Sequence, residues 1–509
     1  MPIWGDDLPS GVVVPTWPEV IRRASDYGLK DAVVSPSARL SYQSMVSEVF
    51  RAQRALTAMG VQRGDRLAVL LGNDWPYLSC YWAALASGVI FVPLNTRLAR
   101  PEVVPILEQI DPALIVVEDR LMPLIPAEWS AHTVSLGEWN QHVASKSAEY
   151  QEPYPVSLED VAVVLYTSGT TGQPKGVMLT HRNIAAQFFQ VITTLVGIRP
   201  SDRVISLYPL FHTAQHVFLQ APLVAGATVI IDEFSPKRVH GLVQREAVTI
   251  FFGVPSMYHI LLQDPTFTAA SFPNIRILAY GASIMPTETI QTLKARFPQA
   301  EICNLYGQTE NSPAVCGLAD PFALTKPGSV GRPVPGMSVM VVDDQDQEVE
   351  PDVVGEVVTQ GINLMKGYWD DYARTDEVVQ YGWYHTGDLG YLDREGFLYI
   401  VDRKKDMIIR GGQNIYPAEV ENVLYTHPDV VECAVIGVSH AIYGQEVAAV
   451  IVGRPGATLT TDGLQRYLTD RIALYKIPVH YHFVEALPHN ANGKILKGEL
   501  RKQAEVGAL

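Results

Sequence analysis

Short apolar runs alternate with longer amphipathic stretches through most of the chain. The runs are rich in valine, isoleucine and leucine and occupy residues 66–71, 113–117, 227–231, 248–252 and 275–279. Strands that are buried on both faces have this composition, and the helical stretches between them allow each strand to run in the same direction as the last. The pattern predicts an α/β fold with largely parallel sheets.

The pattern changes after residue 331. Shorter apolar runs at 340–344 and 355–359 are bounded by acidic turns, which is typical of a smaller, partly antiparallel unit. A charged turn follows at 402–406, and the last hundred residues have their own helix and strands, expected at 417–425, 433–438 and 447–452. We therefore predict two domains, residues 1–402 and 403–509.

Composition agrees with a folded chain of more than one domain. The 509 residues are too many for one ordinary core, and 47% hydrophobic with 18% charged residues is typical of globular proteins. The net charge of −15 argues against nucleic-acid binding, which needs a broad basic face. Any polyanion is expected to be a small ligand held locally.

No targeting segment or membrane span is expected. The most hydrophobic stretch, residues 77–92, is short for a span and is broken by serines and a glycine, so it is interpreted as a buried helix running into a strand. The first ten residues are acidic, with no signal-peptide core. The four cysteines are far apart in sequence, which favours reduced thiols in a cytoplasmic protein: Cys80, Cys303, Cys316 and Cys433.

The stretch YTSGTTGQPKGV, residues 166–177, is the densest candidate for chemistry. A strand that runs into a glycine- and hydroxyl-rich turn presents backbone N–H groups and hydroxyls to an anion, and Lys175 supplies a counter-charge. The stretch is not a P-loop, because Lys175 is followed by Gly176 rather than Ser or Thr, and it lacks the GxGxxG fingerprint. We predict a phosphate-binding loop rather than a flexible surface turn.

This stretch resembles the signature of the acyl-adenylate-forming superfamily, which includes AMP-forming acyl-CoA synthetases, luciferases and adenylation domains of peptide synthetases. Further family elements follow in the expected order: PLFHTAQ (209–215), YGAS (280–283), YGQTE (306–310), YHTGDLG (384–390), DRKKDMIIRGGQNIYPAEVE (402–421) and PHNANGKILKGELR (488–501). The resemblance covers nearly the whole chain. It implies a large N-terminal domain of parallel-rich sheets with a small distorted β-barrel subdomain, and a small mobile α+β C-terminal domain.

The resemblance also implies a two-step reaction with ATP, Mg²⁺ and coenzyme A. A carboxylic acid is joined to the α-phosphate of ATP with release of pyrophosphate, and the acyl group then passes to the thiol of coenzyme A. Both partners in the first step are anions at pH 7, so the site must neutralise charge rather than supply a general base.

The family resemblance also implies which residues would bind ATP. The glycine loop would hold the β- and γ-phosphates, Tyr306 the adenine face and Asp388 the ribose hydroxyls, with Arg403 supporting the ribose or a phosphate. The full ATP set is Thr167, Ser168, Gly169, Thr170, Thr171, Gly172, Lys175, Gly281, Ala282, Tyr306, Gly307, Asp388 and Arg403.

The residues closest to the reaction would be Thr309 at the α-phosphate, Glu310 as the Mg²⁺ ligand, His212 at the mouth of the acyl pocket, and Lys494 between carboxylate and α-phosphate. Taken alone, YGQTE would be an ordinary strand end and helix cap, Asp388 a turn residue, and Lys494 one of several exposed lysines. Lys497 and Lys502 are expected to be such exposed lysines.

The acyl pocket is expected to be mostly apolar. Its lining would comprise Phe211, His212, Gln215, Val217, Gly281, Gly307 and Gln308. No buried basic residue is evident for a second carboxylate, which favours a medium-sized monocarboxylic acid, whether aliphatic, alicyclic or aromatic. His212 and His216 also have the i, i+4 spacing of a zinc pair, but HExxH is absent and the sequence places no third ligand.

In this family the C-terminal domain turns between the two half-reactions. The hinge falls at Lys405, directly after Asp402 and Arg403, and Arg410, Gly411 and Gly412 would then lie at the acceptor side. Arg410 would contact either an acceptor phosphate or the domain interface. The alternatives left open are an amine or carrier-protein acceptor, a luciferase-like oxidase and a non-catalytic relative, and a homodimer is common in the family.

Overall fold

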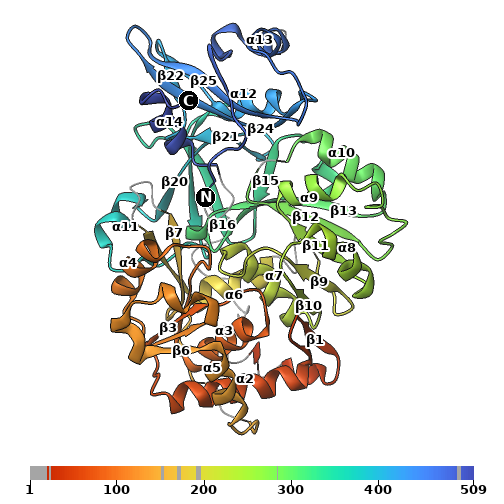
Figure 1. Cartoon of the computed structure of the whole chain (residues 1–509), viewed down its shortest axis with the longest axis vertical. Coiled ribbons are helices and arrows are strands. Elements are labelled where there is room, and N and C mark those ends of the chain that lie inside the picture. The colour runs from red at the N-terminus through yellow and green to blue at the C-terminus, as the bar shows by residue number, and fades with distance from the viewer. Residues whose placement is uncertain are drawn as a thin grey trace. The chain divides into compact units, whose positions relative to one another are not determined.

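The computed structural model describes residues 20–21, 24–150, 154–168, 174–190, 197–283, 285–469, 471–489 and 495–509, with the backbone alone at residues 168, 188–189 and 215–217 (Figure 1). The chain divides into two compact units, Met1–Val339 with Thr359–His385, and Met340–Val358 with Thr386–Leu509. The domain boundary predicted at 402/403 stays a prediction.

The first unit contains a seven-stranded sheet. Its order is β18 (Gly367–Tyr368), β8 (Pro174–Thr180), β7 (Val161–Ser168), β4 (Ile90–Pro93), β3 (Arg66–Leu70), β5 (Leu114–Val117) and β6 (Thr133–Ser135). The strands from β7 to β6 run parallel, whereas β8 and β18 run antiparallel to their neighbours. The two apolar runs predicted as parallel strands here are confirmed, and they are buried on both faces.

Helices cover this sheet. Those described are α2 (Tyr42–Ala58), α3 (Trp75–Ser87), α4 (Arg100–Ile110) and α5 (Leu136–Ala144), and α2 packs against α3 and α5 (Figure 1, red to orange). Every residue of α3 from Pro76 to Ala86 is buried, and Gly88 ends the helix in the left-handed region with φ 67°. The predicted buried helix running into a strand is therefore confirmed as α3 followed by β4.

A second group of nine neighbouring strands belongs to the same unit. Its order is β15 (Ser329–Pro333), β14 (Ala314–Leu318), β13 (Glu301–Gly307), β12 (Ile277–Gly281), β11 (Ile250–Gly253), β9 (Arg203–Ser206), β10 (Thr228–Ile231), β1 (Asp31–Val34) and β2 (Arg39–Ser41). The strands from β13 to β1 are parallel, as predicted for the three apolar runs that fall here. The helices described between them are α6 (His181–Gln190), α7 (Thr213–Val224), α8 (Pro236–Arg245), α9 (Pro255–Leu262) and α10 (Thr287–Arg296).

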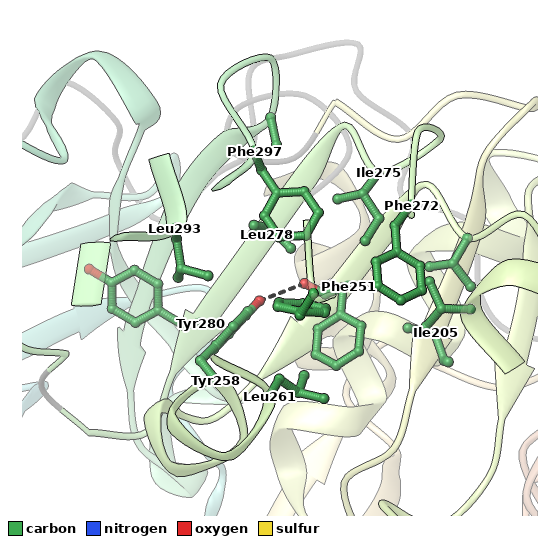
Figure 2. Packing of buried hydrophobic residues seen from close by; sticks show 14 of the residues in the cluster. Ile205, Phe251, Tyr258, Leu261, Phe272, Ile275, Leu278, Tyr280, Leu293 and Phe297 are labelled. Atoms are coloured by element: carbon green, nitrogen blue, oxygen red, sulfur yellow. Dashed lines mark hydrogen bonds between the residues drawn. The ribbon is translucent and has the colours of Figure 1, made fainter. Parts of the chain in front are cut away.

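Aromatic side chains fill the core beside β11 and β12. Phe251 and Tyr258 are fully buried, with ring centroids 5.6 Å apart (Figure 2). The Tyr258 hydroxyl lies 3.1 Å from the carbonyl oxygen of Phe251 and 2.8 Å from that of Ala279, so this buried donor is satisfied by backbone acceptors. The core thus fixes β12, whose end carries Gly281.

Short strands carry the chain into the second unit. Their order is β16 (Met337–Val342), β17 (Gly355–Gly361), β20 (Trp383–Leu392) and β21 (Leu398–Arg403), and β20 and β21 pair antiparallel. Helix α11 (Tyr372–Val378) and β19 (Val379–Gln380), which pairs with the start of β20, belong to the first unit. The predicted change to shorter, partly antiparallel strands after residue 331 is therefore confirmed.

The remainder of this unit is a five-stranded sheet with helices. The strands are β22 (Ile408–Arg410), β23 (Gln413–Ile415), β24 (Val430–His440), β25 (Gly444–Gly453) and β26 (His480–Phe483), and the helices are α12 (Pro417–Leu424), α13 (Thr461–Thr469) and α14 (Lys497–Glu505). The helix and both strands predicted for the last hundred residues are confirmed. In the part of the chain that the structure describes, no helix has the length and apolar character needed to cross a membrane. All four cysteines are buried free thiols.

Candidate functional site

Lys175 lies on the second strand of a hairpin. Strands β7 and β8 pair antiparallel, with Thr167 opposite Lys175 and Ser168 opposite Pro174. The predicted loop residues Gly169, Thr170, Thr171 and Gly172 lie outside the described residues. The lysine therefore follows its loop on a returning strand, which differs from the strand-to-helix arrangement of a P-loop.

The Lys175 ammonium is directed at the hydroxyl of Tyr368. Its Nζ lies 3.3 Å from that oxygen and 4.8 Å from the centre of the ring, and the same hydroxyl donates to Oε1 of Glu310 over 3.0 Å. Burial lowers the pKa of Lys175, and the Glu310 carboxylate opposes that effect. The structure thus brings together two predicted residues from motifs more than a hundred positions apart.

Tyr368 is the functional candidate that sequence reasoning missed. It sits in a short Gly-Tyr-Trp run between Lys366 and Asp370 that matches none of the motifs quoted above, and the residue is 1% exposed. The only available signal was a polar-tipped aromatic beside a glycine, and many core positions share that pattern.

The YGQTE segment is held by a close backbone contact. Gly307 ends β13, and a Cβ at this position would lie 1.5 Å from the carbonyl oxygen of Pro313. Beyond it, residues 309–311 form a single 3-10 turn, and the Glu310 carbonyl accepts from Met365 N at 2.8 Å. The local structure is the strand end expected of such a sequence, and it fixes the Glu310 carboxyl with 9% residue exposure.

The parallel strands β12 and β13 bring two predicted motifs to one edge. Gly281 lies opposite Leu305, and a Cβ on Gly281 would meet the Leu305 carbonyl oxygen at 2.6 Å. Ala282 follows in the left-handed region with φ 69°. Because ligands of open α/β sheets bind at the carboxyl ends of strands, this edge, with Gly281, Ala282 and Tyr306, suits a nucleotide.

His212 lies among aromatic rings. Its imidazole stacks on Tyr208 with centroids 4.6 Å apart and lies 4.7 Å from Phe211. Burial, helped by the charge of Arg97, lowers the pKa of His212 to about 3, so the ring is neutral at pH 7. Its Nε2 is buried without a hydrogen-bond partner among the described residues, and the predicted pocket side chains of Gln215 and Val217, with that of His216, lie outside them.

Asp388 and Arg403 come together in the second unit. They are opposite one another on β20 and β21, with Arg403 Nε 3.3 Å from Asp388 Oδ1. The Asp388 side chain is 7% exposed and the Arg403 side chain 40%. Asp388, which the family resemblance assigns to the ribose, and Arg403, which it assigns to the ribose or a phosphate, are therefore adjacent in the structure.

Asp402 is anchored on both of its carboxylate oxygens. Oδ1 accepts from Arg403 N at 2.7 Å, and Oδ2 accepts from Ala418 N at 2.8 Å in the first turn of α12. Burial raises the pKa of Asp402, and the charge of Lys497 opposes that effect. The predicted hinge residue Lys405 lies in the turn between these two anchoring points.

The prediction that Lys497 is an exposed lysine is wrong. Its Nζ lies 2.7 Å from Oε1 of Glu421, and both side chains are 15% exposed. The reason is that Lys497 opens α14, which packs against β24, and faces the carboxylates of Glu421, Asp402 and Asp406. Lys502 on the same helix is exposed as predicted, whereas Lys494 lies outside the described residues.

The expected acceptor-side residues form the tip of the β22–β23 hairpin. Gly411 and Gly412 take φ values of 56° and 84°, which favour glycine. Arg410 forms an ion pair with Glu446 and lies 4.6 Å from the ring centre of Tyr443. The guanidinium is thus held within its own unit.

Comparison with known proteins shows similarity over nearly the whole chain. The family model described as "AMP-binding enzyme" matches residues 20–369, and "AMP-binding enzyme C-terminal domain" matches residues 419–494. A feruloyl-CoA synthase from Amycolatopsis sp is 37% identical over 96% of this chain and 98% of its own length. The fatty acid–[acyl-carrier-protein] ligase ScoC from Streptomyces coeruleorubidus is 34% identical over 92% of each chain. The crystal structure of ATP-bound MatB from Rhodopseudomonas palustris superposes with a TM-score of 0.89 at 30% identity, over 96% of this chain and 99% of that one.

Proposed function

Since the chain belongs to the AMP-binding enzymes of the acyl-adenylate-forming superfamily, we propose that it is an AMP-forming acid–thiol ligase that converts a carboxylic acid to its coenzyme A thioester. The observation that carries the proposal is the linked set of Lys175, Tyr368 and Glu310. It joins a cation beside a glycine-rich loop to a buried carboxylate beside the carboxyl ends of β12 and β13. A site for a triphosphate and its cation needs this combination.

In the first half-reaction the side chains neutralise charge. Lys175 and the loop before it bind the phosphates that leave as pyrophosphate, while Thr309 and Lys494 stabilise the α-phosphate as the carboxylate attacks. Asp388 and Arg403 hold the ribose, and a neutral His212 borders the acid without adding charge. ATP as the substrate is supported by the ATP-bound state of MatB.

Mg²⁺ fits Glu310 as one ligand among several. The carboxylate is a hard oxygen donor, and Tyr368 occupies one of its oxygens, leaving Oε2 available. Among the described residues no group of three or more His, Cys, Asp or Glu side chains lies together as a metal cluster. Phosphate oxygens and water would complete the coordination, and the cation would supply charge neutralisation for the phosphates.

An aryl-bearing monocarboxylic acid is the substrate class that the acyl side supports best. The rings of Tyr208 and Phe211 each lie within 4.7 Å of the His212 ring and offer planar apolar surface. The feruloyl-CoA synthase relative acts, by its name, in forming an aryl-acid thioester. Aliphatic acids of medium size are the comparison class.

The acceptor is proposed to be coenzyme A, with a carrier protein as the alternative. ScoC, 34% identical to this chain, is named for an acyl-carrier-protein acceptor, and both reactions use the same adenylation step. In either case the segment from Arg410 to Gly412 would approach the acceptor thiol after a rotation at Lys405, and its two glycines leave room for a thin pantetheine arm.

The test is ATP–pyrophosphate exchange across a panel of aryl, alicyclic and aliphatic carboxylic acids, followed by mass analysis with coenzyme A, carrier proteins or amines. We expect exchange to be fastest with aryl acids and a coenzyme A thioester to form. Lys494→Ala should abolish exchange while ATP still binds. Exchange that yields no thioester with coenzyme A would favour the alternative acceptor, and absence of exchange with every acid would reject the proposal.

A further inference from the structure

Tyr368 is held by the same strand that carries Lys175. On β18 it lies opposite Val177 of β8, and the next residue, Trp369, donates its N–H to the carbonyl of Gly176 at 2.7 Å. Because Lys175 precedes these two residues on β8, one ladder of hydrogen bonds fixes the tyrosine relative to the lysine.

The Tyr368 hydroxyl stands between two opposite charges. It lies 3.3 Å from Lys175 Nζ and 3.0 Å from Glu310 Oε1, and the residue that carries it is 1% exposed. Among the described residues Lys175 makes no direct ion pair with a carboxylate. Among the described residues, the Tyr368 hydroxyl is the group that hydrogen-bonds to both the lysine and the carboxylate.

The Tyr368 hydroxyl carries its proton at neutral pH, because the ordinary pKa of a phenol is about 10. A protonated phenol donates to Glu310 while it accepts from Lys175 and from the Tyr384 hydroxyl, so its one proton and two lone pairs are all used. Only Oε1 of Glu310 is used, which leaves the other carboxylate oxygen for a ligand.

We propose that Tyr368 is a positioning residue that holds the phosphate-binding lysine and the metal-binding carboxylate apart before ATP enters. This rests on the function proposed above. Opposite charges in a buried site attract strongly, so without the hydroxyl Lys175 and Glu310 close into a direct ion pair. That pair would remove the lysine from the phosphates and the carboxylate from the cation together.

The experiment is calorimetric titration of Mg·ATP and of Mg-pyrophosphate into Tyr368→Phe, without any acid. The variant keeps the ring and removes only the hydroxyl. We expect both dissociation constants to rise about tenfold, the loss typical of a hydrogen bond to a charged group. In the exchange assay the Mg²⁺ concentration for half-maximal rate should rise while the KM for the acid stays unchanged.

Tyr42→Phe is the matched control. It deletes a buried hydroxyl that donates to the carbonyl of Ala227 in the same unit, on helix α2, which carries none of the predicted site residues. Its Mg·ATP affinity should equal that of the wild type. Equal weakening in both variants, or unchanged affinity in Tyr368→Phe, would overturn the proposal.

A double-mutant cycle provides the second measurement. Lys175→Met and Tyr368→Phe should be non-additive in Mg·ATP affinity, because each removes the same linked unit; additive losses would count against the proposal. If Tyr368→Phe does not fold, Thr375→Val takes its place, because Thr375 Oγ1 accepts from Tyr368 N at 2.9 Å. The dissociation constants of Mg·ATP and Mg-pyrophosphate should then rise as well, but by less than in Tyr368→Phe. Wild-type protein that binds Mg·ATP yet shows no exchange would reject the ligase function while leaving this test intact.

Discussion

At the residue scale, His212 shows how burial sets the chemistry of a side chain. An imidazole near the mouth of an acid-binding pocket could bind a carboxylate as a cation, but the pKa of His212 is lowered to about 3, first by burial and then by Arg97. At neutral pH the ring therefore offers an apolar surface and an Nε2 atom that has no partner among the described residues, but no charge. In the proposed reaction, charge neutralisation would therefore be left to Lys175 and Lys494.

The lowered pKa predicts acid sensitivity of the fold. An unfolded histidine titrates near 6.5, so below about pH 6.5 the unfolded chain binds a proton that folded His212 refuses. The contribution of His212 to the unfolding free energy is fully present above about pH 6.5 and is lost as the pH falls toward 3. In urea titrations, the unfolding free energy of His212→Phe should fall less between about pH 7 and pH 4 than that of the wild type.

The exposed His132 provides the control for that measurement. His132→Gln should keep the wild-type pH dependence. If His212→Phe and the wild type lose stability in parallel, His212 is not buried as a neutral group.

At the element scale, the sequence predicted strands and helices better than the contacts between them. Continuous Val/Ile/Leu runs such as 66–71 identify parallel strands because both faces are buried, and that property is local. Tyr368 and Lys497 gain their roles from partners 58 and 76 residues away in sequence, which no local pattern records. The motifs located Lys175 and Glu310, but only the fold supplied the hydroxyl between them.

Gly307 marks a place where one element depends on close backbone approach. A Cβ at Gly307 would lie 1.5 Å from the Pro313 carbonyl oxygen, so β13 and the turn after it must separate to admit alanine. We expect Gly307→Ala to lower the unfolding free energy by about 3 kcal/mol and to weaken ATP binding. Thermal unfolding and ATP titration measure the two effects.

Gly241 in α8 is the matching control, since a Cβ added there would have no neighbouring atom within 4 Å and its φ is not positive. Gly241→Ala should raise stability by about 0.5–1 kcal/mol through helix propensity. A Gly307→Ala protein as stable as the wild type would contradict the close contact.

The Lys497–Glu421 pair predicts strong coupling between α14 and α12. Lys497→Met leaves Glu421 buried without its cation, which should cost about 3 kcal/mol, whereas removing both charges in Lys497→Met/Glu421→Gln should recover most of the loss. Glutamine keeps the oxygen that accepts from Val435 N. Hydrogen exchange of β24 and β25 measures the stability of this unit.

Lys502, exposed on the same helix, supplies the comparison. Lys502→Met should change stability by less than about 0.5 kcal/mol. Equal effects of the two lysine substitutions would identify Lys497 as a surface residue after all.

At the scale of the whole molecule, the two proposed half-reactions need different groups near the adenylate, Lys494 for the first and residues 410–412 for the second. In the proposed cycle, a rotation of the backbone at Lys405 would exchange them. Asp402 precedes Lys405 and accepts from Ala418 beyond it, so a rotation that keeps Asp402 with the preceding segment must break this hydrogen bond. The anchor therefore favours one of the two orientations.

Fixing the dihedral at position 405 should separate the half-reactions. Proline locks φ near −65°, so we expect Lys405→Pro to slow thioester formation by about tenfold or more while pyrophosphate exchange changes by less than about threefold. Lys405→Ala removes the charge but keeps the backbone free, and it should retain both rates. Single-turnover assays of adenylate formation and of acyl transfer measure the steps separately. Equal slowing of both steps by proline would place the hinge elsewhere, and equal slowing by alanine would show that the lysine charge, rather than backbone rotation, governs the rate.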